Sequence, residues 1–300
     1  MYRKILVGYD EGEQAKDALA LGKQLADAIG AQLVVAGVLQ FDPIWGGFDP
    51  HFRDAEFEDA RKIEEAAKAV DAEAKAAVSS SPARGLHELA EEIEADLILV
   101  GSARHGRVGQ ILAGSVGVAL LHGSPCAVGI APSRYRDQSA DGIAAVTIGF
   151  DGSEESGLAL VAASRLASET GAKLKLISVA EPPPIVASRA GIAGWQNLTE
   201  AGQSRAREQL VKARETVPDG IEVEASLITG DPVDALVNVA EATGTLLVVG
   251  SRGYGPLRRV LLGSVSTDLV RSAPCPLIVI PRGMLDPAGA APNAEVAPAS

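Results

Sequence analysis

Glycines at regular spacing follow an apolar run near the end of the chain. The run 246–249 is short enough to be a buried strand, and Gly250, Gly253 and Gly263 follow it before Ser264, where a helix is expected to begin. Glycine lets the backbone approach a ligand closely, and the first amides of a helix lack an intrahelical partner, so together they can hold a phosphate. The sequence therefore predicts a phosphate-binding loop.

The same pattern occurs once more, earlier in the chain. Gly101, Gly114 and Ser115 each lie 149 residues before a counterpart in the later loop. Asp10 and Asp151 each end a strand-like run at the start of a copy, at a separation of 141 residues. A matched spacing of this kind indicates a tandem duplication.

The earlier loop differs from the later one at its middle glycine, which is Arg104. If that position needs a positive φ or close contact with phosphate, an arginine is strained there or blocks the loop. Alternatively, Gly106 and Gly109 reshape the loop, and Arg104, His105 or Arg107 pairs with phosphate oxygens. The later loop is therefore the better candidate for a phosphate site.

Strands and helices alternate in each copy, which is typical of an α/β fold with a parallel sheet covered on both faces. Alanine and leucine at helical spacing predict a helix over 14–29, stopped by Gly30. Residues rich in alanine, glutamate and lysine predict a long exposed helix over 53–78. For the rest of the first copy we expect strands over 31–39, 97–101 and 127–130 and helices over 85–94 and 115–121. In the second copy, Ser153 is expected to cap the first helix.

The composition excludes several classes of protein. A net charge of −12 argues against a nucleic-acid surface or an anionic membrane partner. No apolar run is long enough to cross a bilayer, and no signal peptide is recognisable. Cys126 and Cys275 are too few for a disulfide framework, so we expect both to be buried and the protein to be cytoplasmic. The four histidines show no metal-binding spacing, so neither a metal site nor a catalytic residue is expected.

The length of 300 residues favours two domains. We expect the first over 1–132, a polar linker over 133–141 and the second over 142–282. Residues 283–300, rich in alanine and proline, are expected to form a disordered tail.

The strand ending in aspartate, the Gly-x2-Gly-x9-Gly-Ser loop and the Pro-Cys turn before the last strand resemble the universal stress protein family. The resemblance covers residues 1 to about 282. It implies two domains, each with a five-stranded parallel sheet of order 3-2-1-4-5. ATP would lie across the carboxyl ends of strands 1 and 4, where the strand order reverses. It also implies that the final strands of the two domains pair with each other, and a further homodimer is possible in such a family.

The family pattern assigns residues to the ATP site of each domain. In the second domain they are Asp151, Val179, Gly250, Gly253, Gly263, Ser264 and Val265. In the first they are Asp10, Val38, Gly101, Gly114, Ser115 and Val116. Mg²⁺ would be bound through the phosphates.

The resulting hypothesis is an ATP-binding stress-response protein that senses or regulates and acts on an unknown signalling protein. One alternative is a slow ATPase or a protein that phosphorylates itself near Ser264 or Ser266. Another is an interaction scaffold in which the nucleotide is structural. The loops lack the lysine of a P-loop, which argues against rapid phosphoryl transfer.

Overall fold

The computed structural model describes residues 2–40, 50–103, 111, 113–138, 142–182, 191–242, 244–251 and 263–281. In the two longest helices, side chains are described from residue 58 and from residue 199 onward. All structural statements below concern these residues.

Each half of the chain contains five strands and four helices among its described residues. The first half comprises β1 (Lys4–Gly8), α1 (Glu13–Ile29), β2 (Gln32–Gln40), α2 (Pro50–Ala69), β3 (Glu73–Ser79), α3 (Pro82–Glu92), β4 (Leu97–Gly101), α4 (Ser115–Leu120) and β5 (Ala127–Ala131). A short 3-10 helix, η1 (Tyr135–Asp137), follows. The second half comprises β6 (Ala145–Gly149), α5 (Glu154–Thr170), β7 (Lys173–Ala180), α6 (Gly191–Glu215), β8 (Val223–Thr229), α7 (Pro232–Ala240), β9 (Thr245–Gly250), α8 (Ser264–Ser272) and β10 (Leu277–Ile280).

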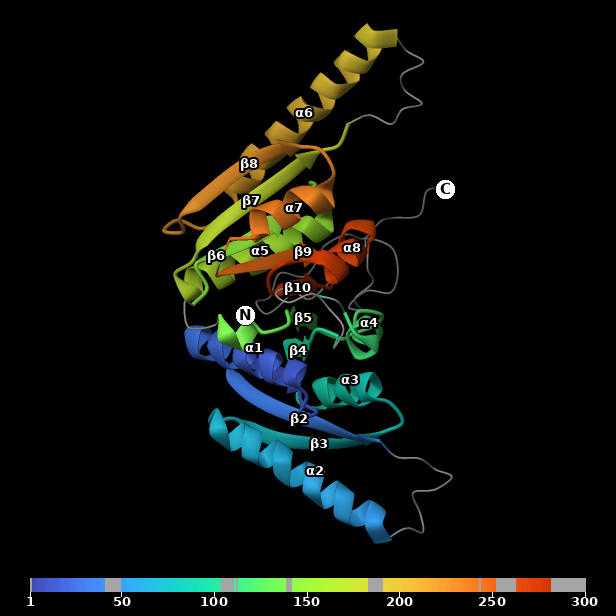
Figure 1. The fold of residues 1–300 in the computed structure, drawn as a ribbon. Coiled ribbons are helices and arrows are strands. Elements are labelled where there is room, and N and C mark those ends of the chain that lie inside the picture. The colour runs from blue at the N-terminus through green and yellow to red at the C-terminus, as the bar shows by residue number, and fades with distance from the viewer. Residues whose placement is uncertain are drawn as a thin grey trace, which may run out of the picture.

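The ten strands form one sheet of order β3-β2-β1-β4-β5-β10-β9-β6-β7-β8. Within each half the strands are parallel and follow the expected order 3-2-1-4-5. The halves join where β5 and β10 pair antiparallel, with Ile278 opposite Gly129. This is the pairing of final strands that the family resemblance implied. In Figure 1, α2 and α6 extend at the two far ends of the molecule.

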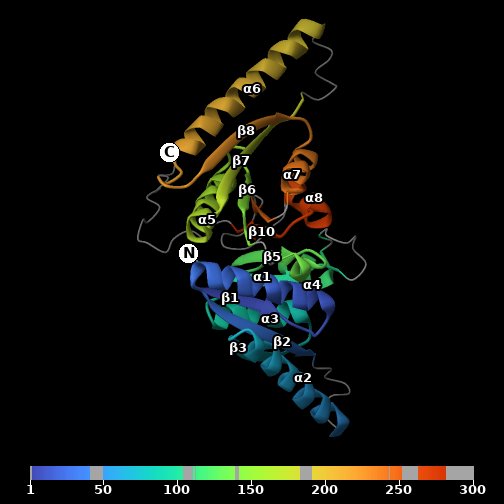
Figure 2. The same ribbon diagram turned by 60° about the vertical axis from the view of Figure 1, so that its left-hand side comes forward.

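Helices cover both faces of the sheet, as the apolar strands require. One buried cluster contains residues of α1, α2, α5 and α6, and another contains residues of α3, α4, α7 and α8. Side chains of each strand alternate between them, since Val7 belongs to the first and Leu6 to the second. In Figure 2, α5 and α6 lie on one side of the second half of the sheet, and α7 and α8 lie on the other.

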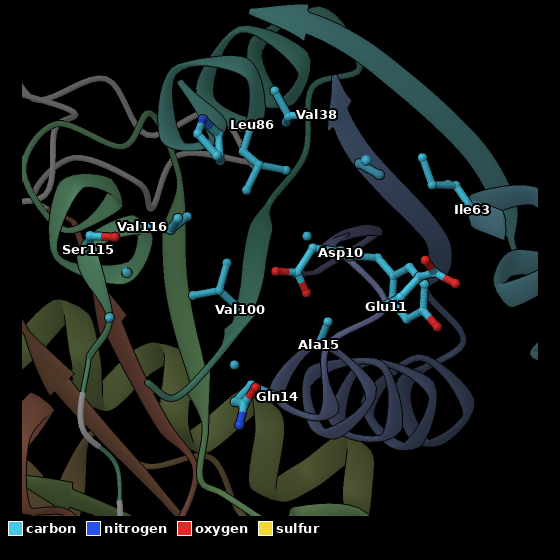
Figure 3. A pocket seen from close by; sticks show the side chains of 18 of the residues that line it. Asp10, Glu11, Gln14, Ala15, Val38, Ile63, Leu86, Val100, Ser115 and Val116 are labelled. Atoms are coloured by element: carbon cyan, nitrogen blue, oxygen red, sulfur yellow. The ribbon is translucent and has the colours of Figure 1, made fainter. Parts of the chain in front are cut away.

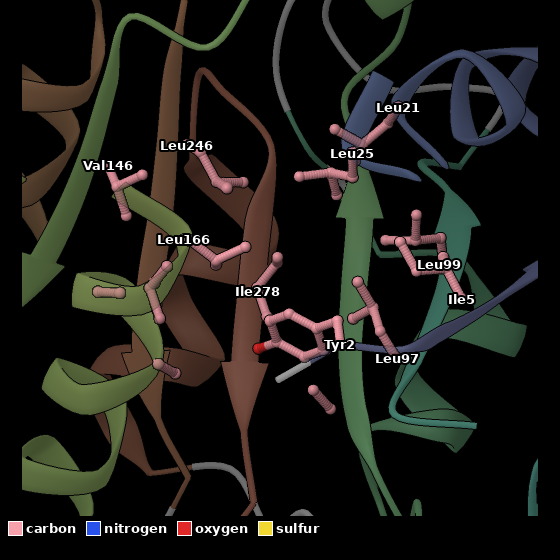
Figure 4. Close-up of a cluster of buried hydrophobic side chains, with 14 of the residues drawn as sticks. Tyr2, Ile5, Leu21, Leu25, Leu97, Leu99, Val146, Leu166, Leu246 and Ile278 are labelled. Carbon is pink, nitrogen blue, oxygen red and sulfur yellow. The ribbon is translucent and has the colours of Figure 1, made fainter. Parts of the chain in front are cut away.

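The hydrophobic core continues from one half into the other. A single cluster includes Leu97 and Leu99 of the first half together with Leu166 and Ile278 of the second. Figure 4 shows side chains of both halves gathered in this cluster, with Tyr2 among them. The two copies are therefore packed as one body around the β5–β10 seam.

Helix boundaries follow from local chemistry. Ser153 caps α5 as expected, since its Oγ accepts a hydrogen bond from the amide of Ser156 at 3.1 Å. Gly30 ends α1 with a left-handed φ of 66°, a conformation that costs glycine little. Asp231 caps α7 by accepting from the amides of Val233 and Asp234. The first two of these boundaries were predicted from the sequence.

The expected long helix over 53–78 is confirmed as far as Ala69, but its continuation to residue 78 is wrong. The structure ends α2 at Ala69, places Asp71 at a positive φ of 56°, and continues as strand β3. Alanine, glutamate and lysine favour a helix by local propensity, which is a weak preference of a few tenths of a kcal/mol per residue. Pairing of the segment with β2, from Val34 opposite Glu73 to Gln40 opposite Ser79, overrides it.

The segment between the halves is more ordered than its polar composition suggested. Tyr135 of η1 is buried and donates a hydrogen bond to Gln24 of α1. The Asp17 carboxylate, only 2% exposed, accepts from the amides of Arg134 and Arg136 at 2.8 and 3.2 Å. Residues 133–138 are thereby fixed to α1. Residues 139–141 and the expected tail over 283–300 lie outside the described residues.

Within the described ranges, no helix combines the length and the apolar character that crossing a bilayer requires. Both cysteines are buried and free, as expected.

Candidate functional site

Two cavities open at the carboxyl ends of the parallel strands. Cavity 1 lies beside β1, β2 and β4 and has a volume of about 490 Å³. Cavity 2 lies at the corresponding place beside β6, β7 and β9 and has a volume of about 750 Å³. In each half the first strand lies between the second and the fourth, so the strand order reverses beside it. Open α/β sheets bind ligands at such a reversal of strand order.

Cavity 2 brings together the described residues that the sequence assigned to the second site. They are Asp151, Val179, Gly250, Gly263, Ser264 and Val265. The remaining one, Gly253, lies outside the described residues, as do its neighbours over 252–262. Strand ends supply the first three, and the first turn of α8 supplies the others, so segments over a hundred residues apart in sequence meet here.

Cavity 1 does the same for the first site. Its lining includes Asp10, Val38, Gly101, Gly114, Ser115 and Val116. Figure 3 shows that Asp10 reaches this cavity from the end of β1 and Ser115 from the start of α4. Residues 104–110 are not described, so the expected roles of Arg104, His105, Gly106, Arg107 and Gly109 lie outside the described residues.

The N-terminus of α8 faces cavity 2 without a side-chain cap. Gly263 is its N-cap residue, with an extended φ of −79° and no side-chain hydrogen bond to the first amides. A Cβ at this position would meet nothing within 4 Å, so neither backbone conformation nor crowding requires glycine there. Open space in front of uncapped helix amides is a suitable place for an anion.

Gly250 is glycine for a different reason. A Cβ at this position would lie 2.7 Å from the carbonyl oxygen of Glu155, in the first turn of α5. Gly101 repeats the arrangement, since its Cβ would lie 2.1 Å from the carbonyl oxygen of Gln14 in α1. We expected these glycines to make room for phosphates, and the structure shows that close packing of strand against helix already demands them.

The aspartate at each first strand is held by the turn that follows it. Asp151 Oδ1 accepts hydrogen bonds from the amide and the hydroxyl of Ser153, at 2.9 and 2.5 Å. Burial raises the pKa of Asp151, but these hydrogen bonds outweigh that effect and hold the pKa below its usual value. In cavity 1, the hydrogen bond that Asp10 Oδ1 accepts within the described part of the chain comes from the amide of Gly12, at 3.0 Å. The second site therefore has the more firmly oriented carboxylate.

The described lining of both cavities is acidic. Cavity 1 contains Glu11 and Asp59 besides its aspartate, and cavity 2 contains Glu155 and Glu181. No lysine or arginine is among the lining residues that the structure describes. An anionic ligand would therefore depend on backbone amides.

Sequence reasoning missed one wall of each cavity. Leu86 of α3 lines cavity 1 and Leu236 of α7 lines cavity 2, each accompanied by the first proline of its helix, Pro82 or Pro232. The signal was present in the repeat, because both copies contain a capping residue, a proline and a leucine at equal spacing. Ser266, considered from the sequence only as a site of self-phosphorylation, also lines cavity 2, and its hydroxyl donates to the Gly250 carbonyl at 3.0 Å and connects α8 to β9.

Comparison with known proteins agrees with this architecture. "Universal stress protein Rv2319c" of Mycobacterium tuberculosis is 28% identical over 297 residues, which cover 92% of this chain and 99% of that protein. "Universal stress protein Rv2005c" of the same organism is 32% identical over 225 residues, covering 73% of this chain and 74% of that protein. The crystal structure of a universal stress protein from Archaeoglobus fulgidus superposes with a TM-score of 0.67 at 24% identity, covering 94% of this chain and all of that one. This last likeness concerns the fold alone.

The family model described as "Universal stress protein family" matches residues 1–132 and 143–281, which is most of the chain. With two matched segments, two parallel half-sheets and two equivalent cavities, the chain belongs to the universal stress protein family as a tandem member.

Proposed function

We propose that this chain is an ATP-binding protein that senses or regulates a stress response, with its principal nucleotide site in cavity 2. The observation that carries the proposal is the uncapped N-terminus of α8, which opens onto a cavity lined by every described residue assigned to the second site. A volume of about 750 Å³ lies within the usual range of small-molecule pockets, about 300–1,000 Å³.

The lining suggests how the nucleotide would lie. Val179 at the end of β7 and Leu236 of α7 offer apolar surface to an adenine ring, and Asp151 lies within the same cavity for a ribose hydroxyl. Gly263 and Ser264 would receive the phosphates at the start of α8. A helix terminus contributes roughly 0.3–2 kcal/mol toward an anion, so hydrogen bonds from individual amides and adenine contacts must supply the rest.

The second site is expected to bind more tightly than the first. α8 has nine residues and α4 has six, so α8 aligns more peptide dipoles toward its ligand. Arg104 replaces the middle glycine only in the first loop. We propose that Mg²⁺ accompanies the phosphates, because the described lining of both cavities is acidic and a divalent cation would reduce repulsion.

Slow hydrolysis or self-phosphorylation is the second candidate. Ser264 is exposed at cavity 2, whereas the Ser266 hydroxyl is buried and already donates to Gly250. Ser264 is therefore the better acceptor of a phosphoryl group. A sensor would instead keep its nucleotide intact and change its affinity for another protein, or for a second copy of this chain.

The direct test is to denature the purified full chain and identify any nucleotide released, and then to titrate the emptied protein by calorimetry. ATP is compared with GTP, which changes the base, and with cAMP, which keeps adenosine but has only one phosphodiester. Each titration is repeated with EDTA. Tight, magnesium-dependent binding of ATP alone supports the proposal. Recovery of ADP with a phosphorylated Ser264 would favour the enzyme, and no binding of any nucleotide would refute the site.

A further inference from the structure

Two backbone hydrogen bonds connect the C-terminal end of α8, in the second half, to Ile111 and Ala113, which precede α4 in the first half. The amide of Ile111 donates to the carbonyl of Ala273 at 2.7 Å, and the amide of Ala113 donates to the carbonyl of Val270 at 2.8 Å. Val270 belongs to the last turn of α8, and Ala273 is its C-cap residue. These donors lie just before Gly114, the N-cap of α4 that lines cavity 1.

The connection is buried and packed. Ile111 and Val270 are each 1% exposed, Ala273 is fully buried, and all three belong to the same hydrophobic cluster. Ala113 also forms an isolated antiparallel bridge with Ser102, which follows β4 at the edge of cavity 1. Breaking either hydrogen bond would leave a backbone amide and a carbonyl unsatisfied in an apolar environment, so the connection holds firmly.

α8 therefore lines cavity 2 with its first residues and is connected at its other end, through Ala113, to the residue before Gly114 of cavity 1. Its first residue, Ser264, and its N-cap, Gly263, line cavity 2, while the carbonyls at its other end accept from the amides of Ile111 and Ala113. A nine-residue helix is about 13 Å long and moves as a rigid element. A displacement of its N-terminus is transmitted to its C-terminus.

We propose that the two cavities are positively coupled through α8, so that nucleotide bound in cavity 2 increases the affinity of cavity 1 for nucleotide. This inference rests on the proposed function. Coupling requires an element whose arrangement both ligands favour. Here that element is α8 with its C-terminal carbonyls hydrogen-bonded to Ile111 and Ala113. A ligand in cavity 2 would contact the N-terminus of α8, and the residue before Gly114 is held by its C-terminal end. Since both ligands favour the same arrangement, each one assists the other.

The first experiment uses the full-length Asp10→Ala variant, which removes a carboxylate at the β1 side of cavity 1 and leaves α8 and residues 111–113 unaltered. Calorimetry with ATP first establishes that one nucleotide binds. Hydrogen exchange followed by NMR then compares the amides of Ile111 and Ala113 with and without ATP. We expect their exchange to slow by about fivefold or more, which is the lower range of typical coupling.

Two amides of the first half serve as internal controls. The amide of Tyr9, which donates to Ala36, reports on the β1 side of cavity 1, and the amide of Asp96, which donates to Lys4, reports on the general stability of this half. Coupling through α8 slows exchange at Ile111 and Ala113 more than at these two. Equal slowing at all four amides, or none at Ile111 and Ala113, would overturn the inference.

The second experiment uses Asp151→Ala, which weakens cavity 2 and leaves cavity 1 intact. Cavity 1 is expected to bind ATP about fivefold or more weakly in this variant than in the wild type with cavity 2 filled. An unchanged affinity contradicts coupling even though both cavities bind. If the wild type binds no ATP at all, the proposed function itself fails, and this result is distinct from ATP binding at two independent sites.

Discussion

The N-cap of α8 has a backbone conformation that any residue can adopt, and the space in front of it is open. We predict that Gly263→Asp leaves the fold intact, because aspartate is among the preferred N-cap residues. Its carboxylate would occupy the place proposed for a phosphate and repel it. The affinity of cavity 2 for ATP is expected to fall at least about tenfold, or about 1.4 kcal/mol. Titration calorimetry measures this affinity, and a thermal melt checks that the variant is folded.

Gly263→Asn is the matched control for this variant. Asparagine has the shape of aspartate and caps helices as well, but it carries no charge. If the loss of affinity comes from charge, Asn retains more binding than Asp. An equal loss in the two variants would show that the side chain blocks the cavity by its size, and full affinity in both would place the phosphates elsewhere.

Gly250 provides the opposite case. A Cβ there would lie 2.7 Å from the Glu155 carbonyl oxygen and 2.8 Å from its carbon, and a backbone neighbour cannot move aside easily. We predict that Gly250→Ala destabilises the protein by about 1–3 kcal/mol, as overpacking does, whereas Gly263→Ala costs less than about 1 kcal/mol, because alanine is only a poorer N-cap residue. Chemical denaturation of both variants measures the difference. Similar stabilities would mean that α5 shifts to accept the methyl group.

These two glycines also show what the sequence could and could not reveal about the site. The repeat identified both as members of a ligand loop, and both line cavity 2. Spacing alone could not show that Gly250 must be glycine because α5 packs against it, whereas Gly263 faces open space. That distinction depends on α5, which lies about a hundred residues earlier in the chain. Leu236 was missed for a different reason: its segment repeats that of Leu86, but nothing in the repeat shows that the segment reaches the cavity.

Among the elements, β3 was the least predictable. Its residues resemble a continuation of α2, and only pairing with β2 makes them a strand. The strands at the centre of the sheet were recognised because both faces are buried and their sequences are continuously apolar. An edge strand such as β3 is half exposed and lacks that signal, so its identity depends on contacts that a local pattern does not contain.

A buried carboxylate contributes to the attachment of η1 to α1, beside the hydrogen bond from Tyr135 to Gln24. Asp17 accepts from two amides, and burial raises its pKa above the usual value. We predict that Asp17→Ala lowers the free energy of unfolding by about 2 kcal/mol, because it leaves the Arg134 and Arg136 amides unsatisfied. Asp17→Asn, which keeps one acceptor oxygen, is expected to lose less. Exposed Asp27→Ala serves as the neutral control and is expected to change little.

The raised pKa of Asp17 gives this prediction a pH dependence. The folded state binds the proton of Asp17 more readily than the unfolded state, so this group's contribution to stability falls as pH rises above the unfolded pKa of about 3.9. The fall ends once the pH exceeds the folded pKa. Urea titrations from pH 3 to pH 7 should therefore show that the difference in free energy of unfolding between the wild type and Asp17→Asn falls as pH rises. Parallel curves would contradict the assignment.

At the scale of the whole molecule, the two copies share a sheet and a core. β5 and β10 are interior strands only because they pair with each other, and Ile278 is fully buried in the cluster that spans both halves. Separated halves would each expose an apolar edge strand, which favours aggregation. The consequence is that global unfolding of the two halves is coupled, whereas local opening at Ile111 and Ala113 can respond to cavity 2 by itself.

We therefore predict that the full chain unfolds in a single cooperative transition, although chains with two domains often unfold in steps. Ile278→Asp places an unpaired charge at the seam and is expected to cost about 3–5 kcal/mol. Exposed Val161→Asp, on α5, is the matched control and should cost little. Calorimetry detects the number of transitions, and amide hydrogen exchange at Asp96 in the first half and Lys173 in the second follows each half separately. If Ile278→Asp speeds exchange at both amides equally, the halves form one unit. Two resolved transitions in the wild type would show that the seam is weaker than its burial indicates, and would limit the coupling that α8 can transmit between the cavities.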